Sequence, residues 1–574
     1  MARSHHWLAS GSGCLFRPEA DHVKVGAASR IGPATALLLT ELSILISLPP
    51  LCSAYEMPSW SAIWCDPALG NDPVRGFRRE LLMLFNSWQF AIFFPVVTLL
   101  YFVLPQAWRW CLLLAASCLF YAAFVPAYLL ILGATIVVDY AAGISMERWP
   151  QRKKAILWAS LASNLGFLFF FKYFNFFNAN ATALAETFGL HNPIRGLDVL
   201  LPIGLSFHTF QAMSYTLEVY RGAQPAERHF GIYALYVMFF PQLVAGPIER
   251  PQNMLPQFRE RHVFEEGRVV AGLRLMLWGL VKKIVIADRL AVPVNLYFSQ
   301  PEGHHGLAPL AAVLLFAFQI YCDFSGYCDI ALGAAQVLGF RLMQNFDRPY
   351  AARSIGEFWR RWHISLSTWF RDYVYVPLGG NRVSPNRWMR NVLIVFLLSG
   401  LWHGAKWTYV AWGGLHGIYL IAGRWTQPLR QRIANLLGLA KRPRLHQAWQ
   451  VLATFTLVCL GWIFFRAESM SDAWGICRSC SAGVRLLLRQ GWKAGWRQVD
   501  FGLSSLFSSP AQLGTCLGLI GGLLLIESWP KGELLIDRIA RWPLMFRWAA
   551  YETAVVSIVL LGEYGSHQFI YFQF

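Results

Sequence analysis

The chain has 574 residues, of which 56% are hydrophobic and 15% aromatic while only 14% are charged, and its mean hydropathy is +0.39. Soluble domains carry about 25% charged residues, so this composition excludes an ordinary soluble protein and favours one embedded in a membrane. The net charge is +18, but Lys and Arg cluster between apolar runs, which is typical of cytoplasmic loops rather than of a nucleic-acid-binding surface. The clearest clusters are Arg148, Arg152, Lys153 and Lys154, followed by Arg424, Arg430, Arg432, Lys441, Arg442 and Arg444.

Residues 1–82 differ in composition from the rest of the chain. They are rich in Gly, Ser and Pro and contain one apolar stretch, 34–48, which is interrupted by Glu41. That stretch is short for a membrane span, and too many residues precede it for an ordinary signal peptide. Because the continuous apolar pattern begins at Met83, we predict that 1–82 is a non-native or loosely ordered extension. Residues 83–574 are then the membrane domain.

From Met83 onward, apolar runs recur that are long enough to cross a bilayer as helices. Strand-like alternation is absent, and helices satisfy their own backbone hydrogen bonds in lipid. We therefore expect an all-α, polytopic integral membrane protein with roughly 10–13 spans. The candidate spans are 88–105, 108–125, 126–143, 155–176, 230–248, 269–288, 307–321, 391–402, 406–423, 448–466, 511–528 and 545–563.

Two segments between these runs are too polar, or too often interrupted by Pro and Gly, to cross the bilayer as single helices. Residues 201–222 begin near a Pro and a Gly and carry His208, Gln211 and Glu218, which predicts a re-entrant or half-buried helix that lies against protein or a water-filled cavity. Residues 341–390 are rich in Arg, Trp and Tyr. Such residues favour the bilayer interface, so we expect amphipathic helices at the cytoplasmic surface there.

Ionisable residues concentrate between positions 358 and 403, and charged groups at membrane depth suggest a functional site. His403 lies in the sequence SGLWHG at the end of an apolar run, and an imidazole is well suited to accept a proton near neutral pH. It is either a general base or a core histidine bonded to a carbonyl. His363 lies 40 residues earlier, so the two rings could meet only through tertiary folding.

Four arginines surround His363 in the sequence: Arg360, Arg361, Arg371 and Arg382. A guanidinium group matches phosphate oxygens with two parallel hydrogen bonds, so these residues are candidates for binding the phosphates of a donor molecule. The alternative is a basic cluster at the membrane interface.

The remaining ionisable residues have simpler interpretations. His416 follows His403 by about 220° around a helix, so we expect a structural role for it. Asp323 and Asp329 lie on different helix faces, so we expect no shared proton. Either could orient a histidine, but an ion pair with an arginine at the membrane surface is favoured for each. The sequence has no nucleotide-binding glycine loop, serine-nucleophile motif or metal-ligand set, so we expect no metal and no tightly bound cofactor. General-base catalysis by one or two histidines is the simplest chemistry left.

The chain resembles the membrane-bound O-acyltransferase family, and within it the branch of alginate O-acetyltransferase integral-membrane proteins. The resemblance extends over 83–574, and its most specific motifs are WHISLS at 362–367 and LWHG at 401–404. The other matching blocks are MLFNSWQFAIFFPVV at 83–97, FPQLVAGPIERP at 240–251, QIYCDFSGYCDIALG at 319–333 and FIYFQF at 569–574.

This resemblance implies a funnel-like helical architecture, with His403 as the catalytic histidine and His363 as the second active-site histidine. It implies a multi-pass protein of the bacterial inner membrane that takes acetyl groups from a cytoplasmic co-substrate, acetyl-CoA. The acetyl groups would cross the lipid bilayer for O-acetylation of an exopolysaccharide such as alginate. The implied partners are periplasmic acetyltransferases and the exopolysaccharide machinery.

Two other functions are compatible with the same residues. One is transfer of D-alanyl or another acyl group to a cell-wall polymer. The other is a transporter or flippase that carries out no chemistry. A transporter could tolerate Gln at position 403, whereas proton abstraction could not.

Overall fold

The computed structural model describes residues 83–198, 201–494, 501–528, 538–564 and 569–570, and every regular element in this part of the chain is a helix. The predicted extension, 1–82, lies outside the described residues, so its status remains a prediction. Six helical stretches are long and apolar enough to cross a membrane. They are α5 (Tyr128–Arg148), the stretch Pro150–Thr187, α14 (Ala308–Leu338), α20 (Pro443–Arg466), α22 (Pro510–Glu527) and α24 (Leu544–Leu561).

These stretches confirm the prediction of an all-α, polytopic membrane protein. The stretch Pro150–Thr187 consists of η2 (Pro150–Arg152), α6 (Lys153–Leu168), the π-helical turn η3 (Phe169–Tyr173) and α7 (Phe174–Thr187). The other helices of the first half are α3 (Trp88–Val103), α4 (Gln106–Ala122), α8 (Leu205–Arg221), α9 (Phe230–Met238), α10 (Phe240–Leu243), α11 (Pro251–Gln257), α12 (Glu266–Leu280), the π-helical turn η4 (Val281–Ala287), α13 (Asp288–Ser299) and η5 (Pro301–Gly303). Those of the second half are η6 (Pro349–Ala351), α15 (Ile355–Trp359), α16 (Ile364–Phe370), the π-helical turn η7 (Arg371–Tyr375), α17 (Pro385–His403), α18 (Trp407–Trp425), α19 (Gln427–Leu436), η8 (Leu439–Lys441), α21 (Met470–Ala494) and η10 (Leu503–Ser505).

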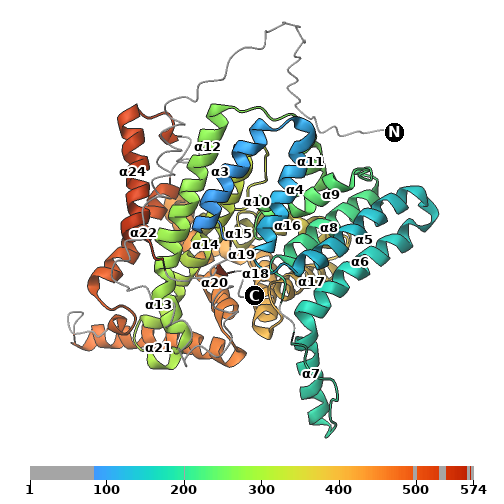
Figure 1. Ribbon diagram of the computed structural model, residues 1–574. Helices are drawn as coiled ribbons and strands as arrows, with labels where there is room; N and C mark the ends of the chain where they lie inside the picture. The colour runs from blue at the N-terminus through green and yellow to red at the C-terminus, as the bar shows by residue number, and fades with distance from the viewer. Residues whose placement is uncertain (1–82, 199–200, 495–500, 529–537, 565–568, 571–574) are drawn as a thin grey trace, which may run out of the picture.

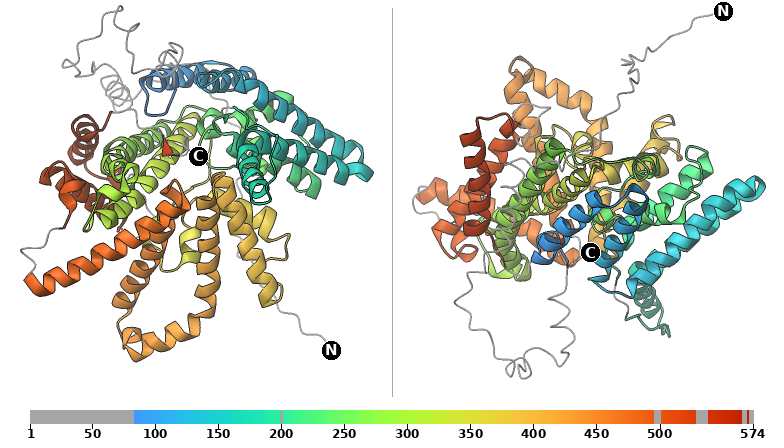
Figure 2. Two further views of the ribbon diagram at one scale, coloured as in Figure 1. Left: turned by 90° about the horizontal axis from the view of Figure 1, so that it is seen from below. Right: turned by 45° about the horizontal axis from the view of Figure 1, so that its top comes forward.

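Helix α14 occupies the centre of the molecule: 83% of its most apolar window is buried, against 11% for α22 and α24. It packs against α12 with the two backbones in contact, because a Cβ atom on Gly279 would lie 2.6 Å from the carbonyl oxygen of Gly326. Small residues permit such close helix packing in membranes. Around this centre, α22 and α24 lie at one edge and α5 and α6 at the opposite edge (Figures 1 and 2).

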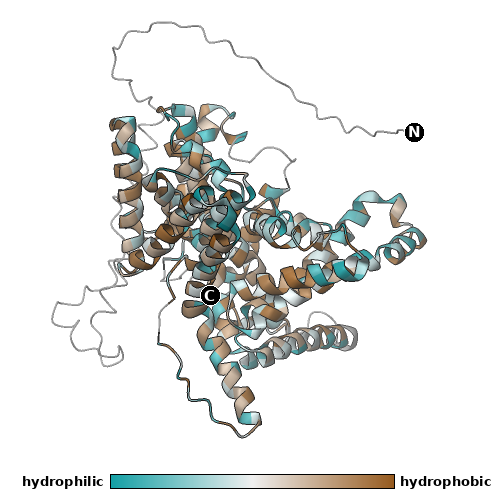
Figure 3. Ribbon diagram, turned by 90° about the vertical axis from the view of Figure 1, so that its right-hand side faces the viewer, coloured by the Kyte–Doolittle hydropathy of each residue, from teal (hydrophilic) through white to brown (hydrophobic). Residues whose placement is uncertain are grey.

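Hydrophobic residues predominate along the helices of the molecule (Figure 3). On α24, for example, Met545 and Leu560 are more than two-thirds exposed, as expected for side chains that face lipid.

The two basic clusters lie at the same side of the molecule. Lys153 places its ammonium 5.2 Å from the ring centre of Tyr220, near the end of α8. Arg221, the last residue of α8, donates a hydrogen bond of 3.0 Å to a carbonyl of η7, which leads toward α17. At the start of α17, the ring of Trp388 lies 4.4 Å from the guanidinium of Arg424. We call this side the basic face.

The structure corrects one predicted span and one predicted surface segment. Residues 230–248 do not form a single span: α9 ends at Met238, α10 has only four residues, and the stretch is buried in protein. Residues 341–390 do not lie wholly at the surface, because Trp362 and His363 are buried in the core. By contrast, α8 is buried along most of its length, which confirms that the helix of 201–222 packs against protein; its re-entrant course stays a prediction.

Candidate active site

His403 is the last residue of α17, and the tight packing of α17 on α18 fixes its position. A Cβ atom on Gly400 or Gly413 would collide with the backbone of the facing helix, so only glycine permits this approach. The imidazole is 3% exposed and is enclosed by aromatic rings. Its ring centre lies 5.0 Å from that of Trp412 and 5.5 Å from that of Phe465.

His363 is fully buried at the start of α16 and adopts a left-handed backbone conformation, with φ of 44°. This conformation is costly for a residue with a side chain and concentrates at functional sites. The side-chain oxygen of Asn345 lies 3.2 Å from Nδ1 of His363 and accepts the backbone N–H of Ser365 at 3.1 Å. Because an amide oxygen only accepts hydrogen bonds, Nδ1 carries the proton and Nε2 is the basic nitrogen.

The structure brings the two histidines together, with ring centres 6.5 Å apart and ring planes at 65°. The rings of Phe207 and Phe324 border His363 at 6.2 and 4.8 Å. The spacing in the sequence required tertiary folding for any such contact, and the structure shows that the contact is made. The catalytic roles of the two histidines remain predictions.

Lys172 was not among the predicted site residues, although its side chain reaches the end of α17. Its ammonium donates hydrogen bonds to the carbonyls of Trp402 at 2.6 Å and His403 at 3.3 Å, and to the hydroxyl of Ser206 at 3.2 Å. A cation is favourable at a helix C-terminus, where the last carbonyls lack partners. Lys172 belongs to η3, and such π-helical turns are frequent at functional sites. Its only signal in the sequence is a charge within an apolar run.

His416 is buried and hydrogen-bonded to another side chain, as expected for a histidine with a structural role. Its Nδ1 accepts a hydrogen bond of 3.2 Å from the indole N–H of Trp359. The ring of Trp412 lies 5.0 Å from His403 and 5.2 Å from His416, so an indole packs against both imidazoles.

The four predicted phosphate-binding arginines have different surroundings. Arg361 is buried and forms an ion pair of 2.5 Å with Glu357. Burial alone would raise the pKa of Glu357, but the backbone N–H of Arg353 and the guanidinium of Arg361 lower that pKa below its ordinary value. Arg361 therefore has a structural partner. Arg360, Arg371 and Arg382 are exposed, and Arg371 pairs with Asp372 at 2.7 Å.

A polar cavity of about 570 Å³ opens near Arg371 on the basic face. We call it the basic-face pocket; it is lined by Glu218, Arg221, Arg250, Gln252, Asp372, Tyr373 and Val376. The guanidinium carbons of Arg221 and Arg250 lie 4.8 and 4.6 Å from the ring centre of Tyr373. Arg250 also forms an ion pair of 3.2 Å with Asp372. Neither arginine was predicted, because a charge at a helix end is common and carries little information.

The basic-face pocket and the histidines lie at opposite ends of one pair of segments, α8 and α16–η7. Near the histidines, the ring of Phe207 borders His363. Further along, Phe210 stacks on Trp369 with ring centres 3.8 Å apart. At the pocket, Arg221 donates its hydrogen bond to η7. The pair therefore connects the basic face with the buried site.

Asp323 and Asp329 are paired with lysines of η4. Lys283 bridges Asp323 and Asp288, each at 2.7 Å, and Lys282 pairs with Asp329 at 2.5 Å. Separate ion pairs were expected, with arginine as the partner; the partners are lysines. Buried charges require such partners, because an unpaired ion in a protein interior is strongly destabilising.

Comparison with known proteins places this site in a family. Residues 223–470, which contain both histidines, match the model of the membrane-bound O-acyltransferase family. The probable alginate O-acetylase AlgI of Pseudomonas aeruginosa is 40% identical over 397 residues, which cover 68% of this chain and 74% of the relative. The peptidoglycan O-acetyltransferase of Helicobacter pylori is 35% identical over a stretch that covers 69% of this chain and 79% of the relative. The teichoic acid D-alanyltransferase of Streptococcus thermophilus is 29% identical over a stretch that covers 49% of this chain and 72% of the relative. The chain therefore belongs to the membrane-bound O-acyltransferase family.

Proposed function

We propose that this O-acyltransferase passes acetyl groups from cytoplasmic acetyl-CoA across the inner membrane for O-acetylation of an exopolysaccharide such as alginate. The observation that carries the proposal is the pair of buried histidines, 6.5 Å apart, at one end of the segments α8 and α16–η7. The basic-face pocket lies at the other end of the same segments.

The orientation of the protein in the membrane follows from the basic face. Lys and Arg are enriched in the cytoplasmic loops of membrane proteins, and both basic clusters lie at this side. The basic-face pocket thus opens to the cytoplasm, where acetyl-CoA is available. The relatives that carry out O-acetylation or D-alanyl transfer are named for polymers of the cell surface, so we infer that the acceptor lies on the opposite side, together with periplasmic acetyltransferase partners.

The basic-face pocket has the chemistry that the nucleotide part of the donor requires. Arg221 and Arg250 offer guanidinium groups for phosphates, and Tyr373 offers a ring that can stack on a base. The exposed Arg360, Arg371 and Arg382 remain candidates for the same role. From His363 to the pocket, α16 and η7 rise by roughly 15 Å, a distance that an extended pantetheine arm can span.

The buried histidines then carry out the transfer. His403 accepts the proton of the acceptor hydroxyl, and the oxygen attacks the thioester carbonyl carbon. The carbon–sulfur bond breaks, and the proton leaves with the thiol, so the acetyl group moves from sulfur to oxygen. His363, with its Nδ1 held by Asn345, presents Nε2 to the reacting groups. Lys172 holds the end of α17 in place.

Transfer of acetyl rather than D-alanyl is favoured by the comparisons. The relatives named for O-acetylation are 35–40% identical over about two-thirds of this chain, whereas the D-alanyltransferase is 29% identical over half of it.

The test compares the ester-linked acetyl content of exopolysaccharide from cells that carry the wild type, His403→Ala or His403→Gln, with membrane levels matched by immunoblot. His191→Ala, at an exposed histidine, is the matched control. We expect both His403 variants to lose acetyl esters and the control to retain them. Normal acetylation by the Gln variant would contradict general-base catalysis and support a transporter.

A further inference from the structure

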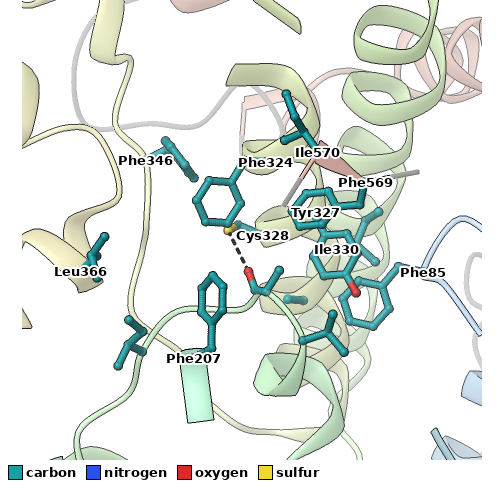
Figure 4. Packing of buried hydrophobic residues seen from close by; sticks show 14 of the residues in the cluster. Phe85, Phe207, Phe324, Tyr327, Cys328, Ile330, Phe346, Leu366, Phe569 and Ile570 are labelled. Atoms are coloured by element: carbon teal, nitrogen blue, oxygen red, sulfur yellow. Dashed lines mark hydrogen bonds between the residues drawn. The ribbon is translucent and has the colours of Figure 1, made fainter. Parts of the chain in front are cut away.

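Two residues that follow α24 return to the core beside α14. Phe569 and Ile570 are 1% and 3% exposed, and their side chains lie next to Phe324 and Tyr327 (Figure 4). Just after α24, the backbone N–H of Glu563 donates to η4 at 3.3 Å, and Arg289 of α13 donates to the carbonyl of Leu561 at 2.7 Å. The segment Phe569–Ile570 itself packs against α14, which carries the aspartates of the buried lysine–aspartate pairs.

The backbone of this segment completes the hydrogen bonding of a buried charge. The N–H of Ile570 donates to one carboxylate oxygen of Asp323 at 2.8 Å, while the other oxygen pairs with Lys283 at 2.7 Å. A buried carboxylate needs partners for both oxygens. The position of Asp323 on α14 therefore depends on the segment as well as on the lysine.

The side chain of Phe569 connects the segment to the active site. Its ring stacks on Tyr327, with ring centres 4.6 Å apart, and lies 6.0 Å from the ring of Phe324. Phe324 in turn meets His363 edge-on at 4.8 Å. A single aromatic ring thus separates Phe569 from the imidazole. Because Phe324 directly follows Asp323, the hydrogen bond of Ile570 and the ring of Phe569 fix the same turn of α14.

We propose that the segment Phe569–Ile570 is a positioning element of the active site, which holds His363 in its reactive orientation through Asp323 and Phe324. The proposal rests on the proposed function, because it assigns His363 to the acyl-transfer site. His363 needs such support since its left-handed backbone is strained, and a strained residue persists only when its surroundings determine its position. Asn345 supports one edge of the imidazole through Nδ1, and Phe324 packs against the ring.

Two pairs of variants separate the two contacts. Ile570→Pro removes the N–H that Asp323 accepts, and Ile570→Val keeps it. Phe569→Ala removes the ring, and Phe569→Leu retains most of the apolar volume. All four are compared with the wild type and His363→Ala as purified full-length proteins.

The first readout is the rate at which diethyl pyrocarbonate modifies each histidine, followed by mass spectrometry. We expect modification of His363 to accelerate at least about threefold in Ile570→Pro and Phe569→Ala, because local loosening exposes the ring. Exposed His191 and buried His416 serve as internal controls and should react as in the wild type. Equal acceleration at His416 would mean general loosening and would overturn the proposal.

The second readout is acetyl transfer from acetyl-CoA to alginate oligosaccharide. We expect kcat to fall about tenfold or more with KM for acetyl-CoA within about twofold, which is the signature of a lost positioning contact. Ile570→Val should behave as the wild type, and Phe569→Leu, which keeps apolar volume but loses the ring, should fall between the wild type and Phe569→Ala. An unchanged kcat, or an unchanged modification rate at His363, overturns the proposal. A wild type without transfer activity would contradict the proposed function, while the modification rates would still decide the role of the segment.

Discussion

Replacement of Lys172 by Met removes the ammonium at the end of α17 while keeping a side chain of similar length. That ammonium donates hydrogen bonds of 2.6 Å to Trp402, 3.3 Å to His403 and 3.2 Å to Ser206. A hydrogen bond that involves a charged group contributes roughly 1.5–3 kcal/mol, and the two longer bonds contribute least. We therefore expect the variant to lose about 2–3 kcal/mol from the positioning of His403. If this loss falls on the transition state, kcat decreases roughly 30- to 150-fold.

The assay is thiol release from acetyl-CoA in the presence of alginate oligosaccharide, with the folded fraction measured by size-exclusion chromatography in detergent. Lys154→Met is the matched control, because Lys154 is exposed on the same helical stretch. It should retain wild-type activity. A Lys172→Met variant with wild-type kcat, or with a loss that only follows its folded fraction, would refute the assignment of Lys172 to the active site.

Substitutions at three further positions, two of them with a control variant, test other parts of the site. Asn345→Ala removes the acceptor that holds the proton of His363 on Nδ1; we expect kcat to fall about tenfold or more, and Asn345→Asp, which keeps an acceptor, to retain more activity. Gly413→Leu inserts a side chain into the contact of α17 with α18, so we expect a destabilisation of at least about 2 kcal/mol, seen as loss of monodisperse protein. Gly414→Ala should be tolerated, because its Cβ atom would meet only ordinary contacts. Arg250→Ala should raise KM for acetyl-CoA about threefold to tenfold with little change in kcat; an unchanged KM would exclude the basic-face pocket as the donor site.

The sequence was sufficient to predict a helical membrane protein and to single out two histidines, because His403 ends an apolar run and His363 lies where ionisable residues concentrate. It did not reveal that His403 and His363 meet, since each lies in a separate helix and only tertiary packing joins them. Lys172 was not predicted as a site residue for a related reason. One lysine in an apolar run has the same pattern whether it reaches the membrane surface or the carbonyls of another helix.

The wrong prediction for residues 230–248 shows a second limit. Apolar residues are required both for contact with lipid and for burial in protein, so hydropathy alone does not distinguish a span from the broken helices α9 and α10. Arg221 and Arg250 illustrate the same point for charges. Their closeness to Tyr373 depends on the way in which α8 and η7 pack, and no sequence spacing records it.

The lysine–aspartate pairs have a consequence for how the chain enters the bilayer during biogenesis. An Asp near the centre of a helix costs roughly 2.5–3.5 kcal/mol on insertion, and α14 carries two, Asp323 and Asp329. Their partners, Lys282 and Lys283, lie on the stretch that directly precedes α14 in the chain. Neither aspartate of α14 has a lysine partner within its own helix, whereas the two segments together give each of them one. The two segments should therefore leave the translocon as one hairpin, and the centre of the molecule would be assembled before α22 and α24, which follow it in the chain, arrive.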